Sequence, residues 1–531
     1  MSNLTPDMFP ASISSGASRC AVAENKAFVN TLPHEVLTAV FEELQGVLNG
    51  SAPLYDTYTR TTVLRITWIC RYWRDVALAT SRFWSIIVDS GYSRGTEWLS
   101  AFLERSRGCP LHVGIQSTSV IANTLVAILA QLIPHAHRLR TLHIQSAMGQ
   151  SLSSLLAPFT EGFPSLEEVN LSEMAWPELL DLSHARFPRL RKVTLTGAPV
   201  PWNKDDFFCS LQVLILRRRR GSGPSTPQAA ALFHILRRSP DIQVLKLDGH
   251  IHSGTESSER LLLADMREME LSGMTPALPN FLDRLTLPSL INMHIAYFDD
   301  VGSSWDITSA LPRQTAYRAL LSRCSSLAID ISGRLACFHA KPSHGFPGGL
   351  KISGTGSEMV SMTAALWEEI LDAFSGSPLS EFEICYHSLA SITSEMWSTL
   401  TARFPNLAAV SISAENEVEN SNEDILLLDT LLTFLTSRAS SGGELYGSHL
   451  RTLTLSHFTL DKPVVEALVR MLSIRNKNGG PLQRLAFRAC FCRREVDVDD
   501  LAAQLEELVE IDVRYDTNSL DDPPNKFQYW Y

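Results

Sequence analysis

The feature that most constrains this fold is a short apolar motif that recurs along most of the chain. Each copy places apolar residues at the first, fourth and sixth positions of a six-residue stretch. Fourteen copies begin between Leu139 and Leu508, and the gaps between their starts run from 21 to 43 residues. A motif repeated at this period predicts a stack of similar units in place of several independent globular domains.

The fourteen copies share their spacing but little of their sequence. They are LRTLHI from Leu139, LEEVNL from Leu166, LRKVTL from Leu190, LQVLIL from Leu211, IQVLKL from Ile242, MREMEL from Met266, LINMHI from Leu290, CSSLAI from Cys324, PGGLKI from Pro347, LSEFEI from Leu379, LAAVSI from Leu407, LRTLTL from Leu450, LQRLAF from Leu482 and LVEIDV from Leu508. Two weaker copies begin at Gly108 and Phe83. We interpret each copy as a short strand.

Helical stripes of apolar residues lie between several of these strands. They cover residues 124–133, 226–238, 362–374 and 423–438, and Thr226 followed by Pro227 is a typical helix start. Strand, helix and strand at this period predict parallel strands on one side of a curved stack and helices on the other. The fold class expected is therefore α/β.

The repeated motif resembles leucine-rich repeats in an irregular form. The Asn or Cys usual after the strand is missing almost throughout, since Ala147, Met174 and Ala198 occupy equivalent positions and only Cys490 fits. The resemblance implies a leucine-rich-repeat-like solenoid without an asparagine ladder. We therefore expect uneven curvature.

One residue in each copy, between the last two apolar positions, points away from the predicted core. These residues form a mixed set without an aromatic ladder, a run of one charge or a metal cluster, which suits a protein or peptide partner. The candidates for binding a target on the concave face are His143, Asn170, Thr194, Lys246, Glu270, His294, Lys351 and Glu383.

Two further helical stripes precede the repeats. Val36, Leu37, Val40, Phe41 and Leu44 form one stripe, and a second runs through residues 63–76 beyond a loop at 46–62. A module of about 55 residues is too small to bury all of these apolar side chains alone. Either another molecule covers part of them, or they pack on each other and on the next domain.

The order of residues in this region resembles an F-box of the kind common in large fungal families. LPHEVL and VFEEL are followed by a Cys, an aromatic-Trp-Arg triplet and then Phe-Trp before a strand, within residues 31–88. The loop at 46–62 is longer than in a compact F-box, and Trp68 and Tyr72 are bulkier than the family pattern.

The resemblance implies that this module binds a Skp-type adaptor and, through it, a cullin-based ubiquitin ligase. Carried over by position, the adaptor-binding residues would be Leu32, Pro33, Val36, Leu37, Phe41, Ile69, Cys70 and Trp73. The repeats would then bind a target protein. The chain would be a non-catalytic receptor that raises the concentration of its target near the ligase.

Composition narrows the classes of partner and compartment. A net charge of -11 argues against nucleic acid, and no uncharged apolar window reaches the length of a membrane span. The nine cysteines are scattered and odd in number, which suggests reduced thiols. We expect an intracellular soluble protein, cytoplasmic or nuclear, with the basic run at 217–220 leaving nuclear import open.

The amino-acid sequence contains none of the common short catalytic motifs. It contains no Walker loop, no Gly-x-Ser-x-Gly elbow and no zinc-helix His pair, so we expect no enzyme activity, no cofactor and no metal site. The expected organisation is a disordered segment at 1–28, an F-box at 29–88, repeats at 89–516 and a tail at 517–531. Two alternatives remain: an F-box protein acting outside the ligase, and a repeat scaffold whose front helices are an end cap.

Overall fold

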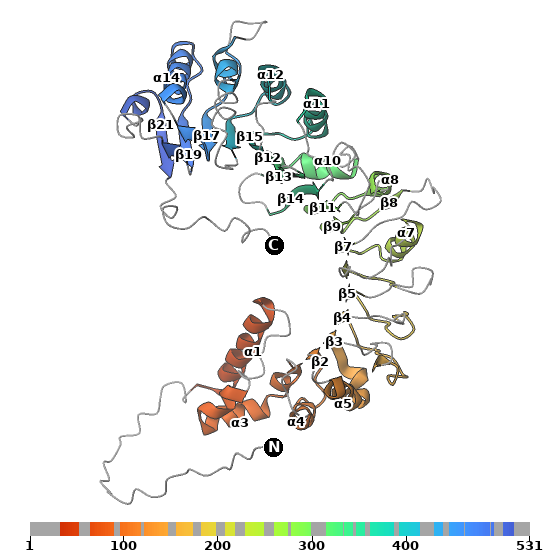
Figure 1. Ribbon diagram of the computed structural model, residues 1–531. Coiled ribbons are helices and arrows are strands. Elements are labelled where there is room, and N and C mark those ends of the chain that lie inside the picture. The colour runs from red at the N-terminus through yellow and green to blue at the C-terminus, as the bar shows by residue number, and fades with distance from the viewer. Residues whose placement is uncertain are drawn as a thin grey trace, which may run out of the picture.

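The chain is a mixed α/β protein built on one large, mostly parallel sheet. The computed structural model describes residues 32–51, 64–89, 96–117, 122–146, 155–173, 182–197, 208–217, 229–248, 260–273, 278–298, 315–332, 334–342, 347–355, 362–386, 392–414, 430–438, 445–460, 462–488, 490–492 and 503–514. The predicted disordered segment at 1–28, the tail at 517–531 and the predicted helix start at Thr226 lie outside these residues. Figure 1 shows the described elements following an arc.

The front of the chain is a small helical module that leads directly into the sheet. It contains α1 (His34–Ser51), a helical segment at 64–69, α3 (Arg71–Ala79) and the 3₁₀ turn η2 (Ser81–Trp84). The Sγ of Cys70 accepts a hydrogen bond of 3.4 Å from the backbone N–H of Trp73 and so caps the start of α3. This module packs beside the first strand, so its position is fixed by the start of the sheet.

The large sheet has 17 strands, and most of them follow one another in chain order. The first block consists of β1 (Ile86–Asp89), β2 (Leu111–Ser117), β3 (Leu139–Ser146), β4 (Glu168–Glu173), β5 (Lys192–Thr196), β6 (Val213–Arg217), β7 (Val244–Asp248), β9 (Glu268–Ser272) and β11 (Asn292–Phe298). The last block consists of β15 (Glu381–Tyr386), β16 (Ala409–Ala414), β17 (Thr452–Ser456), β19 (Arg484–Arg488) and β21 (Glu510–Arg514). Every neighbouring pair within each block is parallel.

The predicted strand positions are confirmed. All fourteen copies of the motif, and both weaker copies, overlap a strand of this sheet. The reason is visible in β7, where Leu245 and Leu247 are buried while Val244 and Lys246 on the other face are partly exposed. The motif therefore marks the side chains that bury one face of the sheet.

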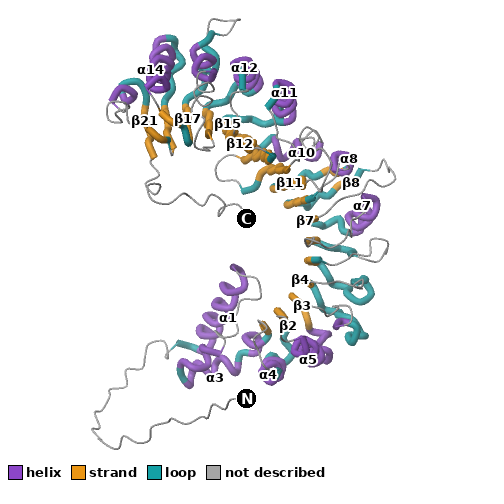
Figure 2. Tube along the Cα trace, in the orientation of Figure 1, coloured by secondary structure: helices purple, strands orange, loops and turns teal. Residues whose placement is uncertain are grey.

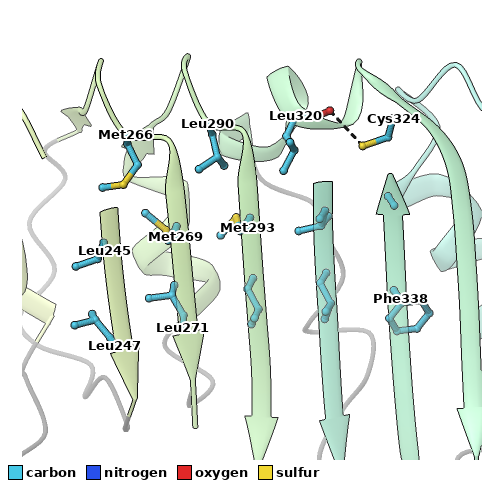
Figure 3. Close-up of a cluster of buried hydrophobic side chains, with 14 of the residues drawn as sticks. Leu245, Leu247, Met266, Met269, Leu271, Leu290, Met293, Leu320, Cys324 and Phe338 are labelled. Atoms are coloured by element: carbon cyan, nitrogen blue, oxygen red, sulfur yellow. Dashed lines mark hydrogen bonds between the residues drawn. The ribbon is translucent and has the colours of Figure 1, made fainter. Parts of the chain in front are cut away.

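The sheet contains an interruption that the motif did not predict. Between the two blocks lie β14 (Gly349–Thr355), β13 (Leu335–Pro342) and β12 (Cys324–Ser332), in the reverse of their chain order. β14 is parallel to β11 and β12 is parallel to β15, whereas β13 is antiparallel to both of its neighbours. Figure 3 shows the strand that carries Phe338 running against the strands beside it.

Helices and loops cover the outer side of the arc, and the strands line its inner side (Figures 1 and 2). The helices beyond the front module are α4 (Glu97–Arg105), α5 (Ala122–Leu132), η3 (Ile133–Arg138), α7 (Ala229–Arg238), α8 (Leu278–Asp283), α10 (Thr315–Leu321), α11 (Ala364–Ala373), α12 (Ser394–Arg403) and α14 (Lys462–Lys477). The structure also contains two short parallel ladders, β8 (Leu261–Leu262) with β10 (Leu285–Thr286) and β18 (Thr459–Leu460) with β20 (Phe491–Cys492). Further helical segments lie at 430–436 and 503–506.

The core between the sheet and these helices is apolar and continuous. Trp367 of α11 is fully buried, and its indole N–H donates a 2.9 Å hydrogen bond to the carbonyl of Met396. The turns before the strands are held by stacked rings: Phe159, Phe163 and Phe187 lie 4.6 and 5.1 Å apart in succession. Aromatic stacking therefore holds the turns before β4 and β5 together.

Candidate functional site

Two of the predicted adaptor-binding residues belong to the core of the front module. Leu37 and Phe41 are both 0% exposed. The ring of Phe41 lies 5.2 Å from that of Trp73 and 5.6 Å from that of Phe83. The prediction that Leu37 and Phe41 face a partner is wrong, because α3 and η2 already cover this side of α1.

The neighbouring residues of α1 form the exposed side of the helix. Val36 is 43% exposed, Val40 is 39% exposed and Leu44 is 41% exposed. These residues are spaced by four, so they lie one above the other on a single face. α1 therefore has two apolar sides, one that faces the core and one that faces outward.

The second helical segment of the module is also apolar on its surface. Trp68 is 69% exposed and Ile69 is 56% exposed at its end. In the part of the chain that the structure describes, ten large apolar side chains are exposed, and six of these lie between residues 36 and 78. An uncovered concentration of this kind is typical of a site that another molecule covers.

The other predicted contacts of the front module have mixed positions. Pro33 is exposed, and Cys70 is partly buried as the cap of α3. Leu32 and Trp73 are partly buried against the core, and the carbonyl of Leu32 accepts a 2.8 Å hydrogen bond from the Tyr72 hydroxyl. Among the predicted contacts, Pro33, Val36 and Ile69 are the ones whose side chains are exposed.

The predicted concave-face residues lie on one continuous row that crosses the first block from β3 to β11 and continues through the reversed strands to β15. In register, the row runs through His143, Asn170, Thr194, Ile215, Lys246, Glu270, His294 and Lys351. Beyond β14 the row continues through His339 and Ala328 to Glu383. His339 was not predicted, because β13 carries no copy of the motif.

The first member of this row is not available at the surface. His143 is 8% exposed, and its Nε2 lies 3.0 Å from a carboxylate oxygen of Glu168. The hydrogen bond from His143 is the largest influence that lowers the pKa of Glu168, and Lys192 at 3.6 Å lowers it further. The prediction of His143 as a target contact is therefore wrong; it holds Glu168 in place.

A cavity of about 560 Å³ opens at the N-terminal ends of β1 to β5. Its lining is charged and includes Arg82, His112, Arg140, Glu168, Arg191 and Lys192. Arg140 pairs with Glu167 at 3.1 Å, and burial followed by the charge of Arg140 lowers the pKa of His112. This cavity lies between the front module and the first repeats, because Arg82 of η2 and residues at the starts of β2 to β5 line it. Its mixed charge suits a polar segment of a protein.

The middle of the row combines acidic and basic side chains. The Nζ of Lys246 lies 2.7 Å from Glu268 and 3.4 Å from Glu270. Glu270 also lies 3.8 Å from the Nδ1 of His294. Burial, and then the charge of Lys351, lower the pKa of His294, while Glu270 opposes this change. This part of the face carries titratable groups that a partner could influence.

The described residues contain no cluster of three or more His, Cys, Asp or Glu side chains that could hold a metal ion. Burial raises the pKa of the Cys324 thiol to about 11, so this cysteine is protonated at neutral pH. None of the described helices has both the length and the apolar composition required to span a bilayer. No family model matches this chain, and no curated protein matches it either.

Proposed function

We propose that this chain is a substrate-receptor subunit of a Skp–cullin–F-box ubiquitin ligase. The front module acts as the F-box and docks on a Skp-type adaptor. The repeats, a leucine-rich-repeat-like solenoid, hold a target protein, and the chain performs no catalysis itself. The observation that carries the proposal is the outward apolar stripe of Val36, Val40 and Leu44 in a module whose core is already complete without it.

The apolar stripe fits recognition of a helix face by an apolar groove. A partner that buries these side chains gains roughly 1.5–3 kcal/mol for each fully covered residue. Ile69 and Trp68 add exposed apolar area in the same small module. The proposed adaptor contacts are therefore Pro33, Val36 and Ile69 from the family resemblance, together with Val40 and Leu44.

The sheet supports the second half of the proposal. Its inner face presents a row of polar and charged side chains, with the apolar positions of the motif turned toward the helices. A face of this kind is suited to a protein surface rather than to a small apolar ligand. The sheet holds the target and the front module holds the ligase, which raises the concentration of the target near the ligase.

Capture of the adaptor tests the proposal. The double variant Val36→Asp with Val40→Asp is expected to lose adaptor binding while keeping its folded circular dichroism spectrum, because both side chains are exposed. Val126→Asp is the matched control, since Val126 is 46% exposed on α5, outside the front module. Substitution of Leu37 or Phe41 would not separate a loss of adaptor binding from a loss of folding, because both side chains lie in the core.

Three outcomes of the capture separate the candidate functions. Adaptor together with a cullin supports the receptor function. Adaptor without a cullin supports an F-box protein that acts outside the ligase. If the wild-type chain captures neither, or if the double variant captures as much adaptor as Val126→Asp does, the proposed docking surface is refuted.

A further inference from the structure

The reversed strands in the middle of the sheet create a basic position that the regular repeats do not have. β14 lies between β11 and β13, so Lys351 stands directly opposite His294 on one side and directly opposite His339 on the other. Residues in register on neighbouring strands point to the same face and lie about 5 Å apart. Three basic side chains therefore stand in one line across three strands.

Acidic residues lie on both sides of His294, Lys351 and His339 along this row. On the β9 side, Glu270 is opposite His294, and its own neighbour Lys246 is bound by Glu268 and Glu270. On the β12 side, Ala328 is opposite His339, and Glu383 of β15 follows.

The flanking rows add further charged and titratable groups, among them Glu381 of β15, which is opposite Ser326 of β12. Lys341 stands two residues from His339 on β13, in register with Ser326 of β12. On the other side, Cys337 is opposite both Ser353 and Asp330. The basic centre therefore lies between Glu270 at one end of the row and Glu383 at the other.

Burial and neighbouring positive charges lower the pKa values of both histidines. Burial lowers the pKa of His339 to about 4, and the charges of Lys341, Lys351 and His294 contribute in that order. The pKa of His294 is lowered by burial and by Lys351 as well. His339 is therefore neutral at pH 7, the pKa of His294 is shifted in the same direction, and an anion above Lys351 would favour the protonated form of each imidazole.

We propose that His294, Lys351 and His339 form an anchoring site for an acidic segment of the target protein. As a target contact, the site rests on the proposed receptor function; as an anion site, it stands on this geometry alone. Lys351 supplies the positive charge, and a protonated imidazole can donate an N–H to a carboxylate. On His294 the Nε2 lies 3.5 Å from the Ser353 hydroxyl oxygen and the Nδ1 lies 3.8 Å from Glu270, so the ligand carboxylate would share these positions with groups of the chain. Glu270 and Glu383 on either side restrict the acidic group to the centre of the row.

Proton uptake is the signature of this site. A bound carboxylate raises the pKa of each histidine, so binding takes up protons, and affinity rises as the pH falls through the bound-state pKa values. The increase ends below the pKa values of the unliganded chain, which for His339 is about 4. An anion site made of lysine alone would show no such dependence above the pKa of the ligand.

The test uses the full chain and a rhodamine-labelled hexaglutamate peptide, with fluorescence anisotropy measured at constant low salt. Between about pH 5.5 and about pH 7.5 the glutamate side chains remain ionised. Lys351→Met is expected to weaken binding roughly tenfold. The control Lys477→Met, at the exposed end of α14, is expected to leave it unchanged.

The double variant His294→Gln with His339→Gln is expected to bind the peptide with an affinity that no longer rises as the pH falls. The proposed anion site would be overturned if Lys351→Met bound the hexaglutamate peptide as tightly as the wild type does. It would also be overturned if the double variant kept the full pH dependence of peptide affinity. Adaptor capture by Lys351→Met should be normal. Adaptor capture that fails in the wild type while hexaglutamate binding follows the expected pattern would refute the receptor function and leave the site intact.

Discussion

The front module and the repeat sheet expose opposite kinds of surface. The module completes its core with Leu37 and Phe41 and still presents Val36, Val40 and Leu44 outward. The sheet directs the apolar residues of each motif toward its helices and presents a polar row on its inner face. The difference shows that one chain presents two surfaces of different chemistry, an apolar one on the front module and a polar one on the inner face of the sheet.

The largest loss of stability is expected from a substitution of Phe41, which tests whether α1 has one apolar side in the core and another on the surface. If this ring is core, Phe41→Ala costs about 3–5 kcal/mol of module stability. The loss should appear as faster amide hydrogen exchange in α3, with the exchange of α14 unchanged because distant repeats are not neighbours. An effect below about 0.5 kcal/mol would instead place Phe41 on the surface and contradict the division of α1 into two apolar sides.

A smaller effect is expected on the polar face of the repeats. Glu168→Gln removes the charge that pairs with His143 and Lys192, and about 1 kcal/mol of stability is expected to be lost at pH 7 after screening by solvent. The folded-state pKa of Glu168 is lowered, so its contribution is present above the unfolded pKa near 4.5 and is lost as the pH falls through the lower folded value.

Denaturant unfolding of the wild type and of Glu168→Gln at several pH values measures this contribution. The two proteins should differ by a constant amount at neutral pH and converge in acid. A difference that grows as the pH falls would contradict the assigned role of His143 as the partner that holds Glu168.

The strand positions were predictable because the motif records burial directly. Each copy overlaps a strand, and the buried face follows from alternation. The reversal of β12 to β14 was not predictable in the same way, because strand order depends on which edges pair and not on the local pattern. β13 does carry a signal, since Ala336, Phe338 and Ala340 alternate as buried residues, but this alternation falls outside the repeated motif.

The front module shows a different limit of sequence reasoning. The predicted stripe contains two adjacent pairs, Val36 with Leu37 and Val40 with Phe41, and neighbours on a helix differ by about 100° in direction. Periodicity alone cannot say which member of each pair faces inward. The packing of α3 and η2 decides this, and it leaves the two valines outside.

The central claim is that another molecule covers the exposed apolar residues of the front module. Hydroxyl-radical footprinting of the full chain, with and without a Skp-type adaptor, measures this at Trp68, Ile69 and Val36, with Val126 as the exposed control. The account predicts that adaptor lowers oxidation at the first three residues and leaves Val126 unchanged. Equal oxidation of Trp68, Ile69 and Val36 in both samples, under conditions that saturate the adaptor complex, would contradict it.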